Sequence, residues 1–308
     1  MIIKSPITWY GGKQKTTKRL LPLIPPHHTY VETHGGAASL LLAKQPSPVE
    51  VYNDINYLLY NFFRVLRNEH LFAQFQHKVA LSPYSRMEYE ECVKAMHDLK
   101  IMQNVGIRKD QITATPRIEN ATVLAEYARM FFIVARQSFG GEFGNSWGSS
   151  STQSRKGMAS TVSAYLSAIE RLPEVHQRIS MVQLECRDFS NIILRYDGPE
   201  TLFYVDPPYL QESRKGGGHG YDHEMRYDDH VRLIGILKNI QGKFLLSGYP
   251  NNLYDEAFNR SIRWNTTCHA AGRTKASGMQ GEGSAKEMQE RTECIWFNYD
   301  IEVDTNDL

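Results

Sequence analysis

The sequence has almost no net charge, no paired cysteines, no fixed-period repeat and no long hydrophobic run. Its formal net charge is +1 over 308 residues, so any nucleic-acid binding has to come from a local basic face. The four cysteines, Cys92, Cys186, Cys268 and Cys294, lie far apart, which argues against a structural zinc site or a disulfide framework. No stretch approaches the ~20 apolar residues of a membrane span, and the amino terminus lacks a secretory signal pattern. We therefore expect a cytoplasmic protein with reduced thiols and no membrane partner.

The first segments of the chain follow the pattern of a nucleotide-binding α/β sheet. Residues 29–32 are β-prone and lead into a glycine turn at residues 34–36. An Ala/Leu-rich helical segment follows at residues 37–44, and a second strand at residues 49–53 ends at Asp54. Strand, glycine turn, helix and strand form the opening of a Rossmann-like doubly wound sheet.

The middle of the chain has a different character. Apolar residues fall at helical spacing through residues 58–66 and again through residues 124–134, as expected for amphipathic helices. A tract rich in glycine, serine and asparagine follows at residues 137–158 and reads as a loop. Strand patterns return later, at residues 201–205, 243–247 and 293–297.

This order predicts one α/β domain with a long insertion. We expect residues 1–56 and 165–308 to form a single Rossmann-like domain, because their strand and helix patterns continue one another. The mostly helical residues 57–164 interrupt it as an insertion.

The segment Asp206-Pro207-Pro208-Tyr209 follows an apolar strand directly. A carboxylate at the carboxyl end of such a strand lies where ligands bind in open α/β sheets. Each proline fixes φ and removes a backbone donor, so the turn presents acceptors. The Asp206 carboxylate and the Pro207 carbonyl suit an exocyclic amino group, and Tyr209 offers a face on which a base can stack. An amino nitrogen held in this way can attack an electrophilic methyl group in line, and Asp206 would stabilise the positive charge that develops on it.

Four further segments suit an electrophilic cofactor, and each also has a plain structural reading. Residues 34–36 allow a close backbone approach to a ligand, or simply form a tight turn. Asp54 is placed to bind ribose hydroxyls, or to cap the following helix. The Trp-Tyr-Gly-Gly-Lys turn at residues 9–13 suits a carboxylate beside stacked rings, or is an aromatic turn with a solvated lysine. Asp188 and Phe189 suit the edge and the face of an adenine ring, or are a surface aspartate and a core phenylalanine.

Taken in order, these segments resemble the Dam-type family of DNA adenine-N6 methyltransferases. The matching segments are Trp9-Tyr-Gly-Gly-Lys13, Val31-Glu-Thr-His-Gly-Gly-Ala-Ala-Ser39, Tyr52-Asn-Asp-Ile55, Asp206-Pro-Pro-Tyr209, Leu246-Ser-Gly-Tyr249 and Arg291-Thr-Glu-Cys-Ile-Trp296. The resemblance implies S-adenosylmethionine as the methyl donor, with Trp9, Lys13, Asp54 and Asp206 as its contact positions. It also implies that the insertion is the DNA target-recognition domain.

The full set of expected site residues combines these arguments. The expected cofactor-binding residues are Trp9, Tyr10, Gly11, Gly12, Lys13, Glu32, His34, Gly36, Asp54, Ile55, Asp188, Phe189 and Asp206, and the expected catalytic residues are Asp206, Pro207, Pro208 and Tyr209. Two departures from the family pattern concern the glycine loop, where His34 replaces an aromatic residue and Ala38 replaces the second glycine. A third is Tyr10, at a position where the family often has alanine.

The expected substrate is double-stranded DNA bound by a monomer. A base inside a duplex is out of reach, so the enzyme has to flip it out or act on single strands. We expect the tract at residues 139–158 and the loop at residues 211–219 to face DNA. The expected phosphate or base contacts are Arg136, Arg155, Lys156, Arg214 and Lys215, and the alternative is ordinary solvated loops. The spacing of His219, Asp222 and His223 argues against a metal site.

Competing interpretations remain open at this point. The same pocket would serve N4 of cytosine. A nicotinamide-dependent oxidoreductase is disfavoured, because the chain has no full Gly-x-Gly-x-x-Gly loop. A DNA-binding module that keeps the fold without turnover is disfavoured by the intact motifs, and a methyltransferase acting on protein or RNA is disfavoured by the insertion.

Overall fold

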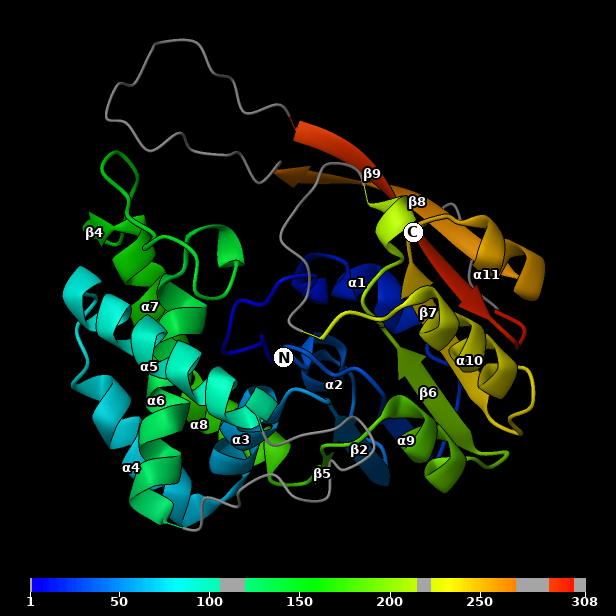
Figure 1. Cartoon of the computed structure of the whole chain (residues 1–308), viewed down its shortest axis with the longest axis horizontal. Helices are drawn as coiled ribbons and strands as arrows, with labels where there is room; N and C mark the ends of the chain where they lie inside the picture. Colours follow the sequence, from blue (N-terminus) through cyan, green and yellow to red (C-terminus); the bar gives the residue numbers. More distant parts are fainter. Residues whose placement is uncertain (1, 106–119, 215–222, 270–287, 302–308) are drawn as a thin grey trace.

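The computed structural model describes residues 2–105, 120–214, 223–269 and 288–301. Its centre is a seven-stranded sheet with the strand order β5-β2-β1-β6-β7-β9-β8 (Figure 1). The strands are β1 (Thr29–Glu32), β2 (Val49–Asn53), β5 (Gln183–Glu185), β6 (Thr201–Val205), β7 (Lys243–Gly248), β8 (Ser261–His269) and β9 (Met288–Phe297). The pairs from β5 to β7 are parallel, and β9 runs antiparallel to both of its neighbours. The predicted α/β class with a mostly parallel sheet is therefore confirmed.

The chain changes direction across the sheet between β1 and β6. From β1 it moves outward to β2 and β5, and it then returns to β6 and continues to β7 on the other side. In open α/β sheets, ligands bind at the carboxyl ends of the strands beside such a reversal. Every residue of β6 is buried, as expected for a central parallel strand that is covered on both faces.

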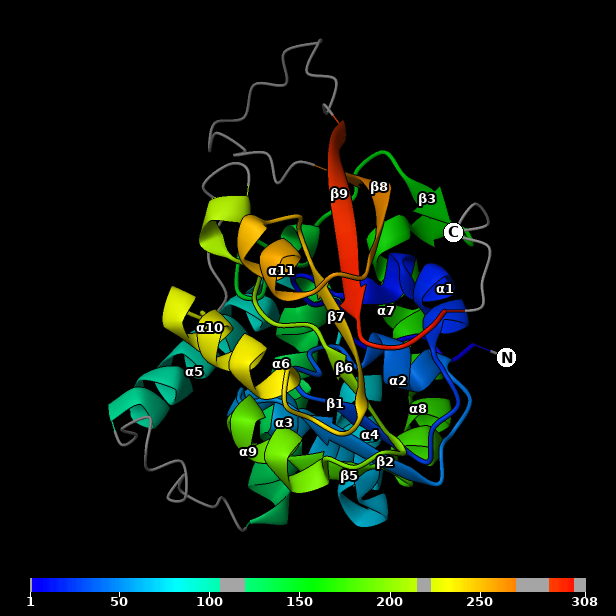
Figure 2. The ribbon, with the colours of Figure 1, turned by 90° about the vertical axis from the view of Figure 1, so that its right-hand side faces the viewer.

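Helices cover both faces of the sheet, as Figure 2 shows with α2 and α8 on one side and α9 and α10 on the other. The helices are α1 (Thr17–Leu20), α2 (Ser39–Ala43), α3 (Tyr57–Arg67), α4 (Glu69–Ala80), α5 (Arg86–Val105), α6 (Ala121–Gln137), α7 (Ser160–Glu170), α8 (Leu172–Ile179), α9 (Phe189–Tyr196), α10 (Tyr227–Leu237) and α11 (Asn252–Ala257). The 3-10 turns are η1 (Lys13–Lys15), η2 (Leu21–Leu23), η4 (Phe139–Gly141) and η5 (Gln211–Ser213). Among the residues that the structure describes, no helix combines the length and apolar character needed to cross a bilayer.

Side chains alternate between the two faces along each strand. On β6, Tyr204 joins the hydrophobic cluster under the long helices, and Phe203 joins the cluster under α9 and α10. On β7, Leu245 and Leu246 divide in the same way. This alternation decides which strand-end side chains share a face, and it therefore determines the composition of the site.

The helices of residues 57–137 form a compact group beside the sheet (Figure 1). Asn56 and Asn120 cap α3 and α6 through their side-chain oxygens, which satisfies the free backbone amides at the start of each helix. The Phe63 ring packs 4.6 Å from the ring of Tyr52 on β2. One hydrophobic cluster therefore continues from the sheet into these helices. Their role as a separate recognition domain stays a prediction.

The tract predicted as a loop at residues 137–158 contains regular structure. Ser138 and Trp147 form an isolated β-bridge, and the tract leads into a hairpin of β3 (Ser154–Arg155) and β4 (Met158–Ala159). Lys156 and Gly157 at its tip have φ values of 53° and 74°. Two successive left-handed residues match the tight turns that fit the twist of a two-residue hairpin.

Candidate active site

Four polar side chains gather on one face of the sheet, where its hydrophobic cluster ends. Glu32 ends β1, Asp206 follows β6, Ser247 lies on β7 and Glu293 lies on β9. Alternation along the strands places them on the same face as Tyr30, Tyr204, Leu245 and Ile295, which all belong to the cluster under the long helices. The end of this face beside the β1–β6 reversal is therefore polar.

Lys13 approaches this polar face from the amino-terminal turn. Gly11 has a φ of 74°, and a Cβ on Gly12 would lie 2.9 Å from the Trp9 carbonyl oxygen, so both glycines are needed for the turn. The turn buries Lys13 and places its Nζ 3.0 Å from Asp206 Oδ1. Ser247 donates a second hydrogen bond to the same oxygen at 2.6 Å. Asp206 is thereby oriented by two donors from separate parts of the chain.

Tyr209 is a second partner of Lys13. Its hydroxyl accepts a hydrogen bond from Lys13 Nζ at 2.5 Å and donates one to Glu293 Oε2 at 2.8 Å. Burial, and next the charge of Glu293, raise the pKa of Tyr209 well above its usual range, so the phenol stays neutral. The ring is buried and packs edge-to-face on Tyr249, with centroids 4.6 Å apart. Stacking of a base on this ring stays a prediction.

The glycine loop after β1 is shaped by close contacts. A Cβ on Gly35 would lie 2.2 Å from the Tyr52 ring, which only glycine avoids. Gly36 has a φ of 49°, and its amide donates to Asp54 Oδ2 at 2.8 Å. Asp54 Oδ1 also accepts the Asn56 amide at 2.8 Å. Asp54 therefore ties the glycine loop to the end of β2, and burial raises its pKa.

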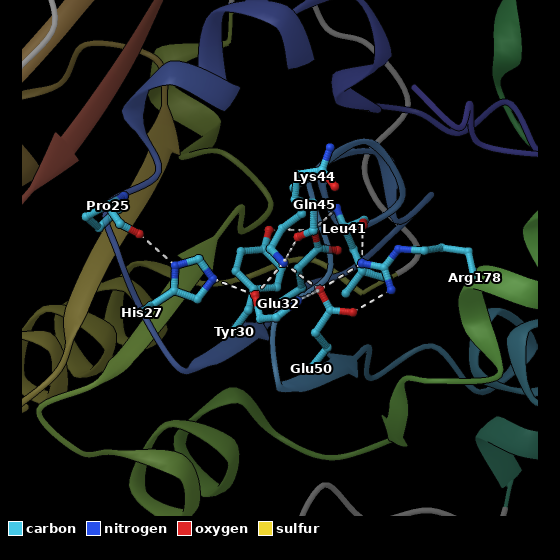
Figure 3. Close-up of polar contacts among 10 residues, drawn as sticks. Pro25, His27, Tyr30, Glu32, Leu41, Lys44, Gln45, Glu50 and Arg178 are labelled. Atoms are coloured by element: carbon cyan, nitrogen blue, oxygen red, sulfur yellow. Dashed lines mark hydrogen bonds and ion pairs between the residues drawn. The ribbon is translucent and has the colours of Figure 1, made fainter. Parts of the chain in front are cut away.

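Glu32 forms the floor of the site and connects it to a buried polar network (Figure 3). Its Oε1 accepts hydrogen bonds from the Tyr30 hydroxyl at 2.9 Å and from the Leu41 amide at 2.8 Å. The Leu41 carbonyl in turn accepts from Arg178 Nη2 at 2.8 Å, and Arg178 also donates to Glu50 at 2.7 Å. Burial raises the pKa of Glu32 to about 8. This network fastens α2, β2 and α8 together behind the site.

Phe189 lies between two other side chains of the site. Its ring centroid is 5.4 Å from that of His34 and 4.4 Å from the guanidinium carbon of Arg232. Burial lowers the pKa of His34 to about 3, so this imidazole is neutral. Asp188 accepts from both Arg232 nitrogens, at 3.0 and 2.9 Å, and it also caps α9. The Asp188 carboxylate thus already has a cationic partner, Arg232.

A pocket of about 1250 Å³ joins these groups. All thirteen residues that the sequence predicted to bind a cofactor line it. They are Trp9, Tyr10, Gly11, Gly12, Lys13, Glu32, His34, Gly36, Asp54, Ile55, Asp188, Phe189 and Asp206. Of the remaining catalytic residues, Pro208 lines the pocket. The structure therefore brings together predicted residues from five separate stretches of sequence.

Comparison with known proteins agrees with this arrangement. The family model of D12 class N6 adenine-specific DNA methyltransferases matches residues 9–270. The chain belongs to this family. It is also 23% identical over 297 residues to the modification methylase StsI of Streptococcus sanguinis, and this match covers 90% of the present chain. The match spans 42% of that relative's length.

Two of the cations that were expected to contact DNA have internal partners in this D12-family chain. Arg214 donates through Nε to the Tyr209 carbonyl at 2.7 Å and pairs with Glu224 at 2.6 Å, so it holds the backbone after the catalytic motif. Arg136 donates to the Ala164 carbonyl at 2.8 Å, and burial lowers its pKa to about 10.

The other expected DNA contacts differ from these two. Arg155 and Lys156 are exposed on the β3–β4 hairpin, and Lys215 lies outside the described residues. Among the described residues, no group of three or more His, Cys, Asp or Glu side chains is arranged to hold a metal ion. His223 belongs to these residues, whereas His219 and Asp222 lie outside them.

Sequence reasoning missed three residues of the site of this D12-family member. Ser247 and Glu293 lie within segments that resemble the family, but only the pairing of β7 with β9 shows that they meet Asp206 and Tyr209. Arg232 lies on α10 and meets Asp188 and Phe189 because α10 packs on α9. Because neither contact is local in sequence, no spacing pattern could have indicated them.

Proposed function

We propose that the chain is a site-specific DNA adenine-N6 methyltransferase that uses S-adenosylmethionine. The observation that carries this proposal is the fixed orientation of Asp206 at the edge of the pocket. Lys13 and Ser247 both donate to Asp206 Oδ1, and Oδ2 is the oxygen proposed to accept an amino hydrogen of the target base. A preorganised acceptor of this kind stabilises the charge that develops on the attacking nitrogen without reorganising during the reaction.

The pocket suits the cofactor in size and in the chemistry of its lining. Pockets for small molecules and cofactors have volumes of roughly 300–1,000 Å³, and this pocket, at about 1250 Å³, has room for the cofactor and the target base together. Asp54 at the end of β2 is placed to accept ribose hydroxyls. The Asp206 carboxylate supplies a carboxyl group opposite a cationic ligand. When bound, S-adenosylmethionine supplies a methyl group on a sulfonium, and the residues of the chain orient the amino group toward it.

Adenine is the proposed base because Asp206 stands before the proline pair and because of the family. The same acceptors would hold N4 of cytosine, so the geometry alone favours neither base. The base is proposed to leave the duplex, since an amino group inside the stack cannot reach a pocket at the end of the sheet.

The proposed DNA reader is the segment of residues 57–164. The β3–β4 hairpin belongs to it and carries two exposed cations, Arg155 and Lys156. Both views show this hairpin and the β8–β9 ribbon projecting toward the same end of the molecule (Figures 1 and 2). Exposed cations on a tight hairpin suit contacts to phosphates, which position a protein on duplex DNA.

The name of the Streptococcus relative suggests a biological setting. It is a modification methylase, and we propose that the present chain likewise modifies DNA as part of restriction–modification. We further propose that it acts as a monomer in the cytoplasm.

The experiment that tests the proposal measures transfer of tritium from labelled S-adenosylmethionine to synthetic duplexes, followed by digestion to nucleosides. Label in N6-methyladenine is expected. Recovery of label only in N4-methylcytosine would refute the adenine assignment, and label in protein or RNA alone would refute DNA as the substrate. If labelled cofactor and DNA both bind but no label moves, the chain is a binding module.

A further inference from the structure

Glu293 is a buried acid that the reaction as described above does not use. It lies on β9 with 8% of its surface exposed, and β9 pairs with β7 beside the catalytic strand end. Its Oε2 accepts the Tyr209 hydroxyl hydrogen at 2.8 Å and lies 4.0 Å from Lys13 Nζ. A carboxylate kept this close to an ammonium, with a phenol between them, is costly to bury unless its partners are fixed.

The direction of each hydrogen bond shows how Glu293 orients the Tyr209 hydroxyl. A phenol has one hydrogen to donate, and it can accept in return. Because Tyr209 donates that hydrogen to Glu293, its oxygen lone pairs are free to accept from Lys13 Nζ. The other described oxygen near the Tyr209 hydroxyl is Ser247 Oγ at 3.4 Å, which is long for an O–H···O hydrogen bond. Glu293 is thus the acceptor that fixes the direction in which the Tyr209 O–H bond points.

The orientation of Tyr209 in turn affects Lys13. The Lys13 ammonium has three hydrogens, and its acceptors include Tyr209, Asp206 and the Gly11 carbonyl. If the phenol turned its hydrogen toward Lys13, the ammonium would lose an acceptor and would move relative to Asp206. Such a shift matters because a displacement of about 1 Å from the productive geometry can cost about a hundredfold in rate.

We propose that Glu293 is a positioning residue for methyl transfer, acting through the Tyr209 hydroxyl and the Lys13 ammonium to fix the Asp206 carboxylate. This inference rests on the proposed function. Glu293 does not line the pocket proposed for the cofactor and the base, and its influence passes along one chain of hydrogen bonds.

The test compares Glu293→Gln, Tyr209→Phe and the double variant in single-turnover methylation of duplex DNA. Glu293→Gln keeps the shape but replaces the charged acceptor by a neutral amide, whose oxygen accepts more weakly and whose nitrogen can only donate, so kcat should fall about tenfold to a hundredfold. The KM for DNA and the Kd for S-adenosylmethionine should change by less than about twofold, since Glu293 does not line the pocket proposed for them. The double variant should be no slower than Tyr209→Phe alone, because residues that act through one another are not additive.

Asp300→Asn is the matched control for charge. Asp300 follows the end of β9, is exposed and pairs with Arg260 at 2.8 Å, so its loss should leave kcat unchanged. A double variant whose loss in kcat equals the product of the two single losses would overturn the inference. A Glu293→Gln enzyme with the wild-type kcat would also overturn it. A lower unfolding temperature with normal kcat would also overturn it, because that result indicates a structural role only. If the wild-type chain transfers no methyl group, the proposed function fails first and positioning for that reaction fails with it.

Discussion

Lys13 Nζ lies 3.0 Å from Asp206 Oδ1, and this ion pair joins the first glycine turn of the chain to the end of β6. Both partners are largely buried, with side chains 8% and 16% exposed. The contact means that the segment expected to bind the cofactor also orients the segment expected to bind the base. The Lys13 ammonium group therefore links the segment proposed to bind the cofactor to the segment proposed to bind the base.

Replacing Lys13 by methionine should lower kcat for methylation by about a hundredfold, a loss typical of removing one preorganised donor from a transition-state site. Asp206 would keep only the hydrogen bond from Ser247 and would be free to rotate. Single-turnover methylation measures the effect. Lys15→Met is the control, because Lys15 lies in the same turn but is exposed. Equal losses in both variants would show that general charge, and not the ion pair, is responsible.

Ala38→Gly should cost the folded protein less stability than Ala37→Gly. Ala38 has a φ of 53°, a left-handed conformation that costs a residue with a Cβ about 1–2 kcal/mol, whereas glycine adopts it freely. This gain is offset by the greater chain entropy of glycine when unfolded and by the loss of a buried methyl group, so the free energy of unfolding should stay within about 1 kcal/mol of the wild type. Urea denaturation measures it. Ala37→Gly also loses a buried methyl group but relieves no positive φ, so it should destabilise by more. An Ala38→Gly variant that loses as much stability as Ala37→Gly would contradict the expectation.

The stability of the wild-type protein relative to Glu32→Gln should fall as the pH rises. Burial raises the pKa of Glu32 from an ordinary 4.5 to about 8 in the folded state. A carboxyl whose pKa is raised on folding keeps its proton longer in the folded state than in the unfolded state. Its contribution is therefore complete below about pH 4.5 and is lost progressively as the pH rises to about 8.

Unfolding free energies of both proteins at about pH 5.5 and pH 8 provide the measurement. Between these two pH values, the free energy of unfolding of the wild type relative to that of Glu32→Gln should fall by about 2–3 kcal/mol, at roughly 1.4 kcal/mol per pH unit. Glutamine does not titrate, so groups such as Asp54 and Glu50 cancel in the comparison. A difference that stays constant or grows in favour of the wild type would show that Glu32 is ionised in the folded protein.

Charge reversal of Arg155 and Lys156 should weaken DNA binding and reduce its salt dependence. Each lost phosphate contact lowers the magnitude of the slope of log affinity against log salt by about one. The slope of the double variant should therefore be smaller by about two. Fluorescence anisotropy across a salt series measures this slope. Arg214→Ala should instead lower kcat with little change in slope, because Arg214 holds the Tyr209 carbonyl. Unchanged affinity of the hairpin variant at low salt would remove the hairpin from the DNA interface.

The sheet and the pocket could be predicted because their signals are local. An apolar strand, a glycine turn and a carboxylate at a strand end are read from neighbouring residues, and the expected cofactor positions indeed line one pocket. The hairpin at residues 154–159 was missed because its strands are only two residues long each. Such a pattern is too short for periodicity to reveal.

The partners of the charged side chains could not be predicted from sequence. Arg136 and Arg214 looked like free cations beside flexible segments, but both donate to backbone carbonyls. Glu293 and Tyr209 meet only because β9 is inserted antiparallel beside β7. These contacts depend on tertiary packing between distant segments, which composition and spacing do not encode.

The most direct test of the account is single-turnover formation of N6-methyladenine in duplex DNA by the wild-type chain and by Asp206→Asn. Binding of DNA and of S-adenosylmethionine is measured on the same samples. The wild type should form N6-methyladenine, and Asp206→Asn should still bind DNA but react at least about a hundredfold more slowly. An Asp206→Asn enzyme as fast as the wild type, or a wild type that forms only N4-methylcytosine, would contradict it.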